Sequence, residues 1–126
     1  MKAVYITDLH EEIAKELIKR LRRNPQSAMM SYGELCKLVG NKIDPRNIAN
    51  YIGDLSVWCN KIGAPMISAL IYNQRSNMPG KGFFHLYSDL YDRNVKKEDE
   101  ERVFVDEVNK VLRYRKWDKL EKYLGL

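Results

Sequence analysis

Near the start of the chain, apolar residues recur every four positions at Leu9, Ile13, Leu17 and Leu21. This spacing places them on one face of a helix. Thr7 or Asp8 can cap its start, and Asn24-Pro25 breaks it. The basic residues at positions 19–23 fall in its last turn, where they either complement the helix dipole or contact phosphate groups. We therefore expect an N-terminal amphipathic helix within residues 1–27.

A short second helix is predicted from Tyr32 to Val39. The Ser31 side chain can accept a hydrogen bond from the Glu34 amide while the Glu34 side chain reaches back to the Ser31 amide, which is a capping box. Gly40 follows and can adopt the left-handed conformation that ends a helix.

A third helix is predicted after a tight connection, with Asp44 as its N-cap and Pro45 as its first residue. Its apolar face consists of Ile48, Ile52, Leu55, Cys59 and Ile62. We expect Gly53 to kink or split this helix, and Gly63 with Pro65 to end it. Two helices joined so closely predict a helix-turn-helix unit, whose second helix commonly enters the DNA major groove.

Two short segments after this unit have the composition of strands. Residues 66–72 end in strand-forming residues, and residues 83–87 read Phe-Phe-His-Leu-Tyr after a turn-rich stretch. Together they predict a β-hairpin, which would form a wing beside the two helices. Gln74, Arg75 and Lys81 would lie at its tip, where such residues suit contact with a nucleic-acid backbone and equally suit solubility.

The last segment, residues 96–126, is predicted to be helical because apolar residues again recur at helical spacing. We expect one domain over residues 1–126, with a winged-helix-like core at 28–88 between the N-terminal helix (1–27) and the C-terminal helical segment. The predicted fold class is α+β, a helix-turn-helix plus β-hairpin with flanking helices.

Composition narrows the function classes without choosing among them. Hydrophobic residues make up 44% and charged residues 31%, as in soluble globular proteins. No apolar run is long enough to span a bilayer, and the first residues become charged before a signal-peptide core could form, so we expect a cytoplasmic protein. The net charge of +5 favours polyanionic partners only weakly. By itself it is better explained by an ordinary basic surface.

No cluster of residues in the sequence predicts catalysis or a metal site. Cys36 and Cys59 occupy apolar helix positions, which is typical of buried free thiols. His10 and His85 stand alone, as polar surface residues or hydrogen-bonded core residues do. The acidic residues lack the spacing of metal ligands. We expect neither a metal nor a cofactor.

Several motifs of the central region follow a recognisable order: Tyr32-Gly33-Glu34, Gly40, Arg46, Pro65 and the glycine-rich segment 77–83. In this order they resemble the winged-helix DNA-binding domain of the methylguanine-DNA methyltransferases and their non-catalytic alkyltransferase-like relatives. The resemblance covers about residues 28–88. It implies that Arg46 stands where that family has a DNA-intercalating arginine and Pro65 where it has its active-site proline.

The sequence departs from this family at the reactive residue. Met66 stands at the position of the nucleophilic cysteine, and Ile67 and Ser68 replace the histidine and arginine that follow it. Alkyl transfer requires a thiolate activated by a neighbouring base, and a thioether cannot form one. Cys59 has no histidine near it in the sequence. We therefore expect the chain not to be an enzyme, and a damaged-base pocket is not implied.

These features together predict a non-catalytic protein that binds nucleic acid, with duplex DNA as the expected partner. The residues expected to contact it are Tyr32, Arg46, Asn47, Asn50, Arg75 and Lys81. Tyr32 is as well explained by core packing as by DNA contact. The main alternative is a protein-interaction module on the same scaffold, such as a phage-encoded inhibitor of a host defence enzyme. A third possibility is a subunit that supplies DNA recognition to a separate nuclease, by analogy with restriction-type proteins.

Overall fold

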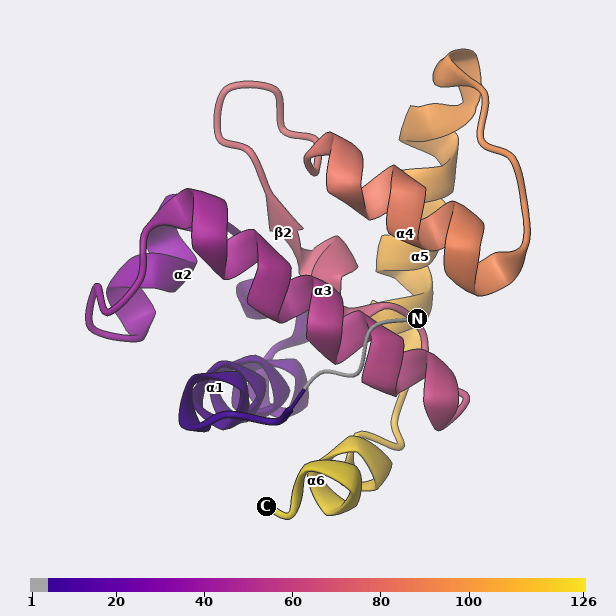
Figure 1. Ribbon diagram of the computed structural model, residues 1–126. Coiled ribbons are helices and arrows are strands. Elements are labelled where there is room, and N and C mark those ends of the chain that lie inside the picture. The colour runs from indigo at the N-terminus through magenta and orange to yellow at the C-terminus, as the bar shows by residue number, and fades with distance from the viewer. Residues whose placement is uncertain (1–4) are drawn as a thin grey trace.

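The computed structural model describes residues 5–126, and its elements are arranged around one long central helix, α3 (Pro45–Lys61) (Figure 1). The other helices are α1 (Asp8–Arg23), α2 (Tyr32–Leu38), α4 (Lys81–Tyr91), α5 (Glu100–Arg113) and α6 (Asp118–Leu124). The short 3-10 helices are η1 (Pro25–Ala28), η2 (Ile67–Leu70) and η3 (Lys97–Asp99), and the strands are β1 (Met30–Ser31) and β2 (Ile71–Tyr72). The protein is thus mainly helical, with a small two-stranded sheet.

The local signals at helix ends are confirmed. Thr7 is the N-cap of α1. At α2, the Glu34 amide donates to Ser31 Oγ at 3.1 Å and the Ser31 amide donates to a Glu34 carboxylate oxygen at 3.1 Å, which completes the capping box. Asp44 caps α3 by accepting from the Asn47 amide at 2.9 Å. The helix-turn-helix prediction therefore gave the correct bounds of α2 and α3 within one residue.

The predicted hairpin is wrong. Strands β1 and β2 are parallel and come from distant parts of the chain, with Met30 opposite Ile71. The segment predicted as the returning strand lies inside α4. Its buried residues Phe83, Phe84 and Tyr87 recur at helical spacing, and the Phe83 ring packs edge-on against Phe104 of α5. A strand would turn neighbouring phenylalanines to opposite faces, whereas a helix buries both.

The expectation that Gly53 interrupts the third helix is wrong. Helix α3 runs unbroken through Gly53, which lies beside Leu86 of α4. The C-terminal segment is helical, as expected, and consists of η3, α5 and α6. Helix α5 ends because Tyr114 has extended backbone angles, and the chain then turns so that Trp117 is buried. This break allows α6 to pack beside α1 and α3.

Two buried polar side chains connect elements across the core. His10 Nε2 lies 2.9 Å from Asp54 of α3, while His10 Nδ1 accepts a hydrogen bond from the Thr7 amide at 2.9 Å. Because Nδ1 is an acceptor, Nε2 carries the ring proton and donates a hydrogen bond to the Asp54 carboxylate. Glu107 of α5 is fully buried and accepts hydrogen bonds from the Met66 amide, at 2.8 Å, and from the Tyr91 hydroxyl. No helix within residues 5–126 is both long enough and apolar enough to cross a membrane.

Candidate nucleic-acid interface

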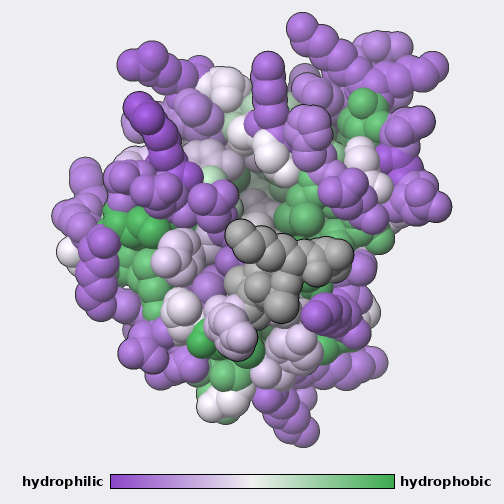
Figure 2. All heavy atoms as spheres, viewed as in Figure 1, coloured by the Kyte–Doolittle hydropathy of each residue, from purple (hydrophilic) through white to green (hydrophobic). Residues whose placement is uncertain are grey.

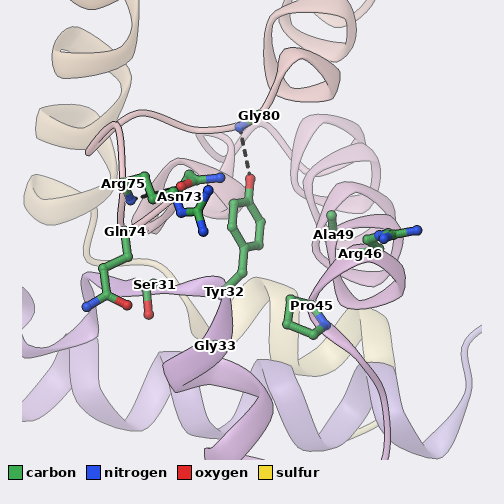
Figure 3. Close-up of a pocket in the computed structure, with 10 residues that line it drawn as sticks. All are labelled: Ser31, Tyr32, Gly33, Pro45, Arg46, Ala49, Asn73, Gln74, Arg75 and Gly80. Atoms are coloured by element: carbon green, nitrogen blue, oxygen red, sulfur yellow. Dashed lines mark hydrogen bonds between the residues drawn. The ribbon is translucent and has the colours of Figure 1, made fainter.

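A cleft of about 410 Å³ lies where the starts of α2 and α3 face the loop after β2 (Figure 3). Its lining consists of Ser31, Tyr32, Gly33, Pro45, Arg46, Ala49, Asn73, Gln74, Arg75 and Gly80. Three of the residues predicted to contact nucleic acid, Tyr32, Arg46 and Arg75, therefore lie at one cleft although they come from three separate segments.

The small parallel sheet brings these segments together. Ser31 at the end of β1 is opposite Tyr72 at the end of β2, so helix α2 and the loop after β2 leave the same edge of the sheet side by side. The Tyr32 hydroxyl then accepts a hydrogen bond from the Gly80 amide at 3.1 Å (Figure 3). This contact joins α2 to the residue that precedes α4.

Residues 73–78 of this loop form a hydrogen-bonded turn, which we call the finger. The Asn73 amide donates to the Met78 carbonyl at 2.8 Å, and the Asn77 amide donates to the Asn73 carbonyl at 2.8 Å. Asn73 Oδ1 also accepts from the Arg75 amide at 2.9 Å. Asn77 has a positive φ of 57°, which asparagine tolerates better than most residues. The finger is therefore a closed, hydrogen-bonded turn with exposed side chains at 73–77.

The charge distribution around the cleft favours an anion. Arg46 and Arg75 are exposed and form no ion pair within residues 5–126. The first turns of α3 and α4 lie beside the cleft, and no side chain caps α4 at Gly80. The start of a helix carries a partial positive charge, although at α3 the Asp44 carboxylate offsets part of it. Hydrophilic side chains cover most of the face seen in Figure 2.

The structure places the other three predicted residues around the cleft rather than in its lining. Asn47 lines a neighbouring cleft of about 600 Å³, and its side-chain amide donates to Asp44 at 3.1 Å. Asn50 lines an adjoining cavity of about 570 Å³ between α3 and α4, which shares Tyr32 and Gly80 with the cleft. Lys81 is exposed as the first residue of α4, next to Gly80. Arg46 itself extends away from Tyr32, whereas Arg75 lies close to it (Figure 3).

The sequence reasoning missed two side chains of the cleft, Asn73 and Gln74. Gln74 had been placed at the tip of a wing, but neither residue was among the predicted contacts. The available signal was the turn-rich composition of residues 73–82. That signal indicates a loop but cannot show which side of the loop faces α3, because this depends on the parallel pairing of β1 with β2.

The residues compared with the alkyltransferase active site form no nucleophilic centre. Met66 is fully buried. Cys59 is also fully buried, and burial raises the pKa of its thiol to about 12, so it stays protonated at neutral pH. His85 lies exposed on α4 rather than on a strand. Within the described chain no three histidine, cysteine or acidic residues are grouped as metal ligands would be.

Comparisons of the chain with models of protein families, with curated proteins and with solved structures gave no match.

Proposed function

We propose that this protein binds duplex DNA without catalysis, through the cleft between α2, α3 and the finger. The observation that supports the proposal most strongly is that Tyr32, Arg46 and Arg75 line the same cleft. Arginine guanidinium groups suit phosphate oxygens because they are always charged and can form two parallel hydrogen bonds. With Lys81 beside them, they form a cationic rim about a cleft that the helix starts make favourable for anions.

The two-helix unit also supports this proposal. Helix α3 follows α2 after the short connection 39–44, and Arg46 lies in its first turn, where the recognition helix of a helix-turn-helix contacts DNA. A relationship to the alkyltransferase-like proteins is part of the proposal and rests on the order of motifs over residues 28–88. A non-catalytic role fits the burial of Met66 and the raised pKa of the Cys59 thiol.

The proposal is tested by measuring the affinity for duplex DNA as a function of salt. Each phosphate contact releases counterions, so the affinity should fall linearly on a log–log plot, with a slope of about −3 to −4.5 for about three to five contacts. Single-stranded DNA and RNA of the same length serve as comparisons. A flat response to salt, or no binding to duplex DNA at low salt, would favour the protein-partner alternative.

Substitution of Arg46 separates a specific contact from diffuse charge. Arg46→Ala should weaken duplex binding by more than Lys37→Ala, which removes the same charge from the neighbouring cleft, and by more than Arg93→Ala beyond the far end of α4. All three residues are exposed, so the free energy of unfolding should change by no more than about 0.5 kcal/mol in each variant. Equal losses of affinity in all three variants would reduce Arg46 to part of a diffuse basic surface.

A further inference from the structure

The polar side chains around the cleft differ in whether they are free to contact a ligand. The Asn47 amide is bound to Asp44, and Asn73 Oδ1 accepts from the Arg75 backbone. By contrast, the Gln74 amide and the Arg75 guanidinium take part in no hydrogen bond to other residues of the described chain, 5–126. Both side chains are exposed on the finger, and Figure 3 shows them extending from it at the cleft.

The backbone that carries these two side chains is held in place. Within the finger the hydrogen bonds of Asn73 and Asn77 close the turn. At its base, β2 pairs with β1 on one side, and the Gly80 amide donates to Tyr32 on the other. A contact element that is already ordered loses less conformational entropy on binding than a flexible loop does. The ordered finger can therefore hold its side chains in position for specific hydrogen bonds. A general attraction to phosphates would not require such order.

We propose that the finger reads base edges in the DNA major groove, with Gln74 and Arg75 as the specificity-determining residues. This inference rests on the proposed binding of duplex DNA and adds sequence selectivity to it. A glutamine amide forms two hydrogen bonds with adenine N6 and N7, and an arginine guanidinium forms two with guanine O6 and N7. Gln74 is uncharged, so a phosphate would engage only the donors of its amide, whereas the adenine edge matches both its donor and its acceptor. The expected target is a short site containing adenine and guanine.

The first part of the test is selection of preferred duplexes from a randomised pool by the wild-type protein, followed by affinity measurements on the variants. Gln74→Ala should reduce the discrimination at an adenine position by about 5- to 100-fold. Its affinity for unrelated duplex should stay within a few-fold of wild type. Gln26→Ala is the matched control, because Gln26 is an exposed glutamine on η1 outside the cleft. It should leave both quantities unchanged.

A second variant separates hydrogen-bond geometry from charge. Arg75→Lys keeps the positive charge but loses the planar pair of donors, so it should weaken the preference for guanine while the dependence of affinity on salt stays close to that of wild type. Arg75→Ala should reduce the discrimination for guanine by about 5- to 100-fold, because it removes both donors to the guanine edge. If Arg75→Ala kept the guanine preference, the direct reading of guanine by Arg75 would be excluded.

Modified DNA tests whether the contacts lie in the major groove. Replacing the preferred purine by its 7-deaza analogue removes the N7 acceptor, so it should weaken wild-type binding but cause no further loss in the variant whose contact is already missing. An equal loss in wild type and variant would overturn the inference, as would salt-dependent duplex binding with no sequence preference. In that last case the proposed binding of duplex DNA would still hold, but without the reading of bases by the finger. Absence of any duplex binding would overturn both.

Discussion

At the scale of single residues, burial decides the chemistry of the two thiols. Cys59 of α3 is fully buried, and burial raises the pKa of its thiol to about 12, with the nearby Glu107 carboxylate acting in the same direction. Burial also raises the pKa of the Cys36 thiol, but Cys36 forms part of the lining of the cleft beside Lys37. Both cysteines are buried, as predicted. Of the two, Cys36 also borders a cleft at the surface.

We expect the two cysteines to react with a thiol reagent at different rates. In Cys59→Ser, which leaves Cys36, labelling by a disulfide reagent at neutral pH should need only local motion around the cleft. In Cys36→Ser, which leaves Cys59, labelling should proceed no faster than unfolding, because the buried thiolate is strongly disfavoured. The comparison is of labelling rates in native buffer, with both rates measured in denaturant as the reference. Equal native rates would contradict the burial of Cys59.

The same pKa shift predicts a dependence of stability on pH. The Cys59 thiol ionises near pH 9 when exposed and at about 12 when folded, so the folded state binds more protons between these values. The stabilisation from the protonated thiol is therefore complete below about pH 9 and is lost as the pH rises towards 12. The free energy of unfolding should fall more steeply over pH 9–11 in wild type than in Cys59→Ser. If the free energy of unfolding fell equally steeply with pH in wild type and Cys59→Ser, this prediction would be contradicted.

At the scale of elements, α3 is continuous although Gly53 was expected to interrupt it. The glycine lies in the helix interior, and a Cβ there would contact Leu86 Cδ2 at an ordinary 3.8 Å. Packing against α4 therefore keeps the helix intact, since tertiary contacts outweigh a propensity cost of about 1 kcal/mol. The absence of a Cβ is not needed to bring the two helices together.

Gly53→Ala is therefore expected to stabilise the protein by about 0.5–1 kcal/mol, because alanine loses less conformational entropy in a helix. Chemical denaturation measures this change. Gly63→Ala is the matched control, since Gly63 has a φ of 78° at the end of α3 and no neighbouring atom within 4 Å of the added Cβ. It should destabilise by about 1–2 kcal/mol through backbone strain alone. Destabilisation by Gly53→Ala would show that α3 and α4 pack more tightly there than the distance indicates.

At the scale of the whole molecule, α6 closes the structure against α1 and α3 in two ways (Figure 1). Leu120 is fully buried. Arg22 of α1 and Glu121 form an ion pair at 2.6 Å, with Arg22 about half exposed and Glu121 30% exposed. Exposed ion pairs contribute little because water already solvates both charges, whereas a buried leucine contributes its full transfer and packing energy. Apolar burial rather than the ion pair should hold α6 in place.

This comparison predicts different costs for two neighbouring substitutions. Leu120→Ala should lower the free energy of unfolding by about 2–5 kcal/mol. Glu121→Ala should lower it by less than about 1 kcal/mol, and that small effect should shrink at high salt. Urea denaturation of both variants at low and high salt provides the measurement. If Glu121→Ala lowered the free energy of unfolding by more than Leu120→Ala did, the ion pair rather than apolar burial would be the main contact that holds α6.

Helix boundaries in this chain follow from neighbouring residues. The caps at Thr7, Ser31 and Asp44 act over three positions, so the starts of α1, α2 and α3 could be predicted without knowledge of the rest. The apolar stripes of α1 and α3 likewise depend only on spacing. The placement of Arg46 in the first turn of an exposed helix start was predictable for the same reason.

The pairing of distant segments could not be predicted in this way. Whether residues 83–87 form a strand or a helix depends on the side chains of α5 that cover them, and the start of α2 meets the finger only because β1 pairs with β2. These contacts join residues more than 20 positions apart, and no local rule selects them from the alternatives. The sequence thus determined where α1, α2 and α3 begin and that both cysteines occupy apolar helix positions. Only the tertiary packing decided that residues 83–87 are helical and that Tyr32, Arg46 and Arg75 line one cleft.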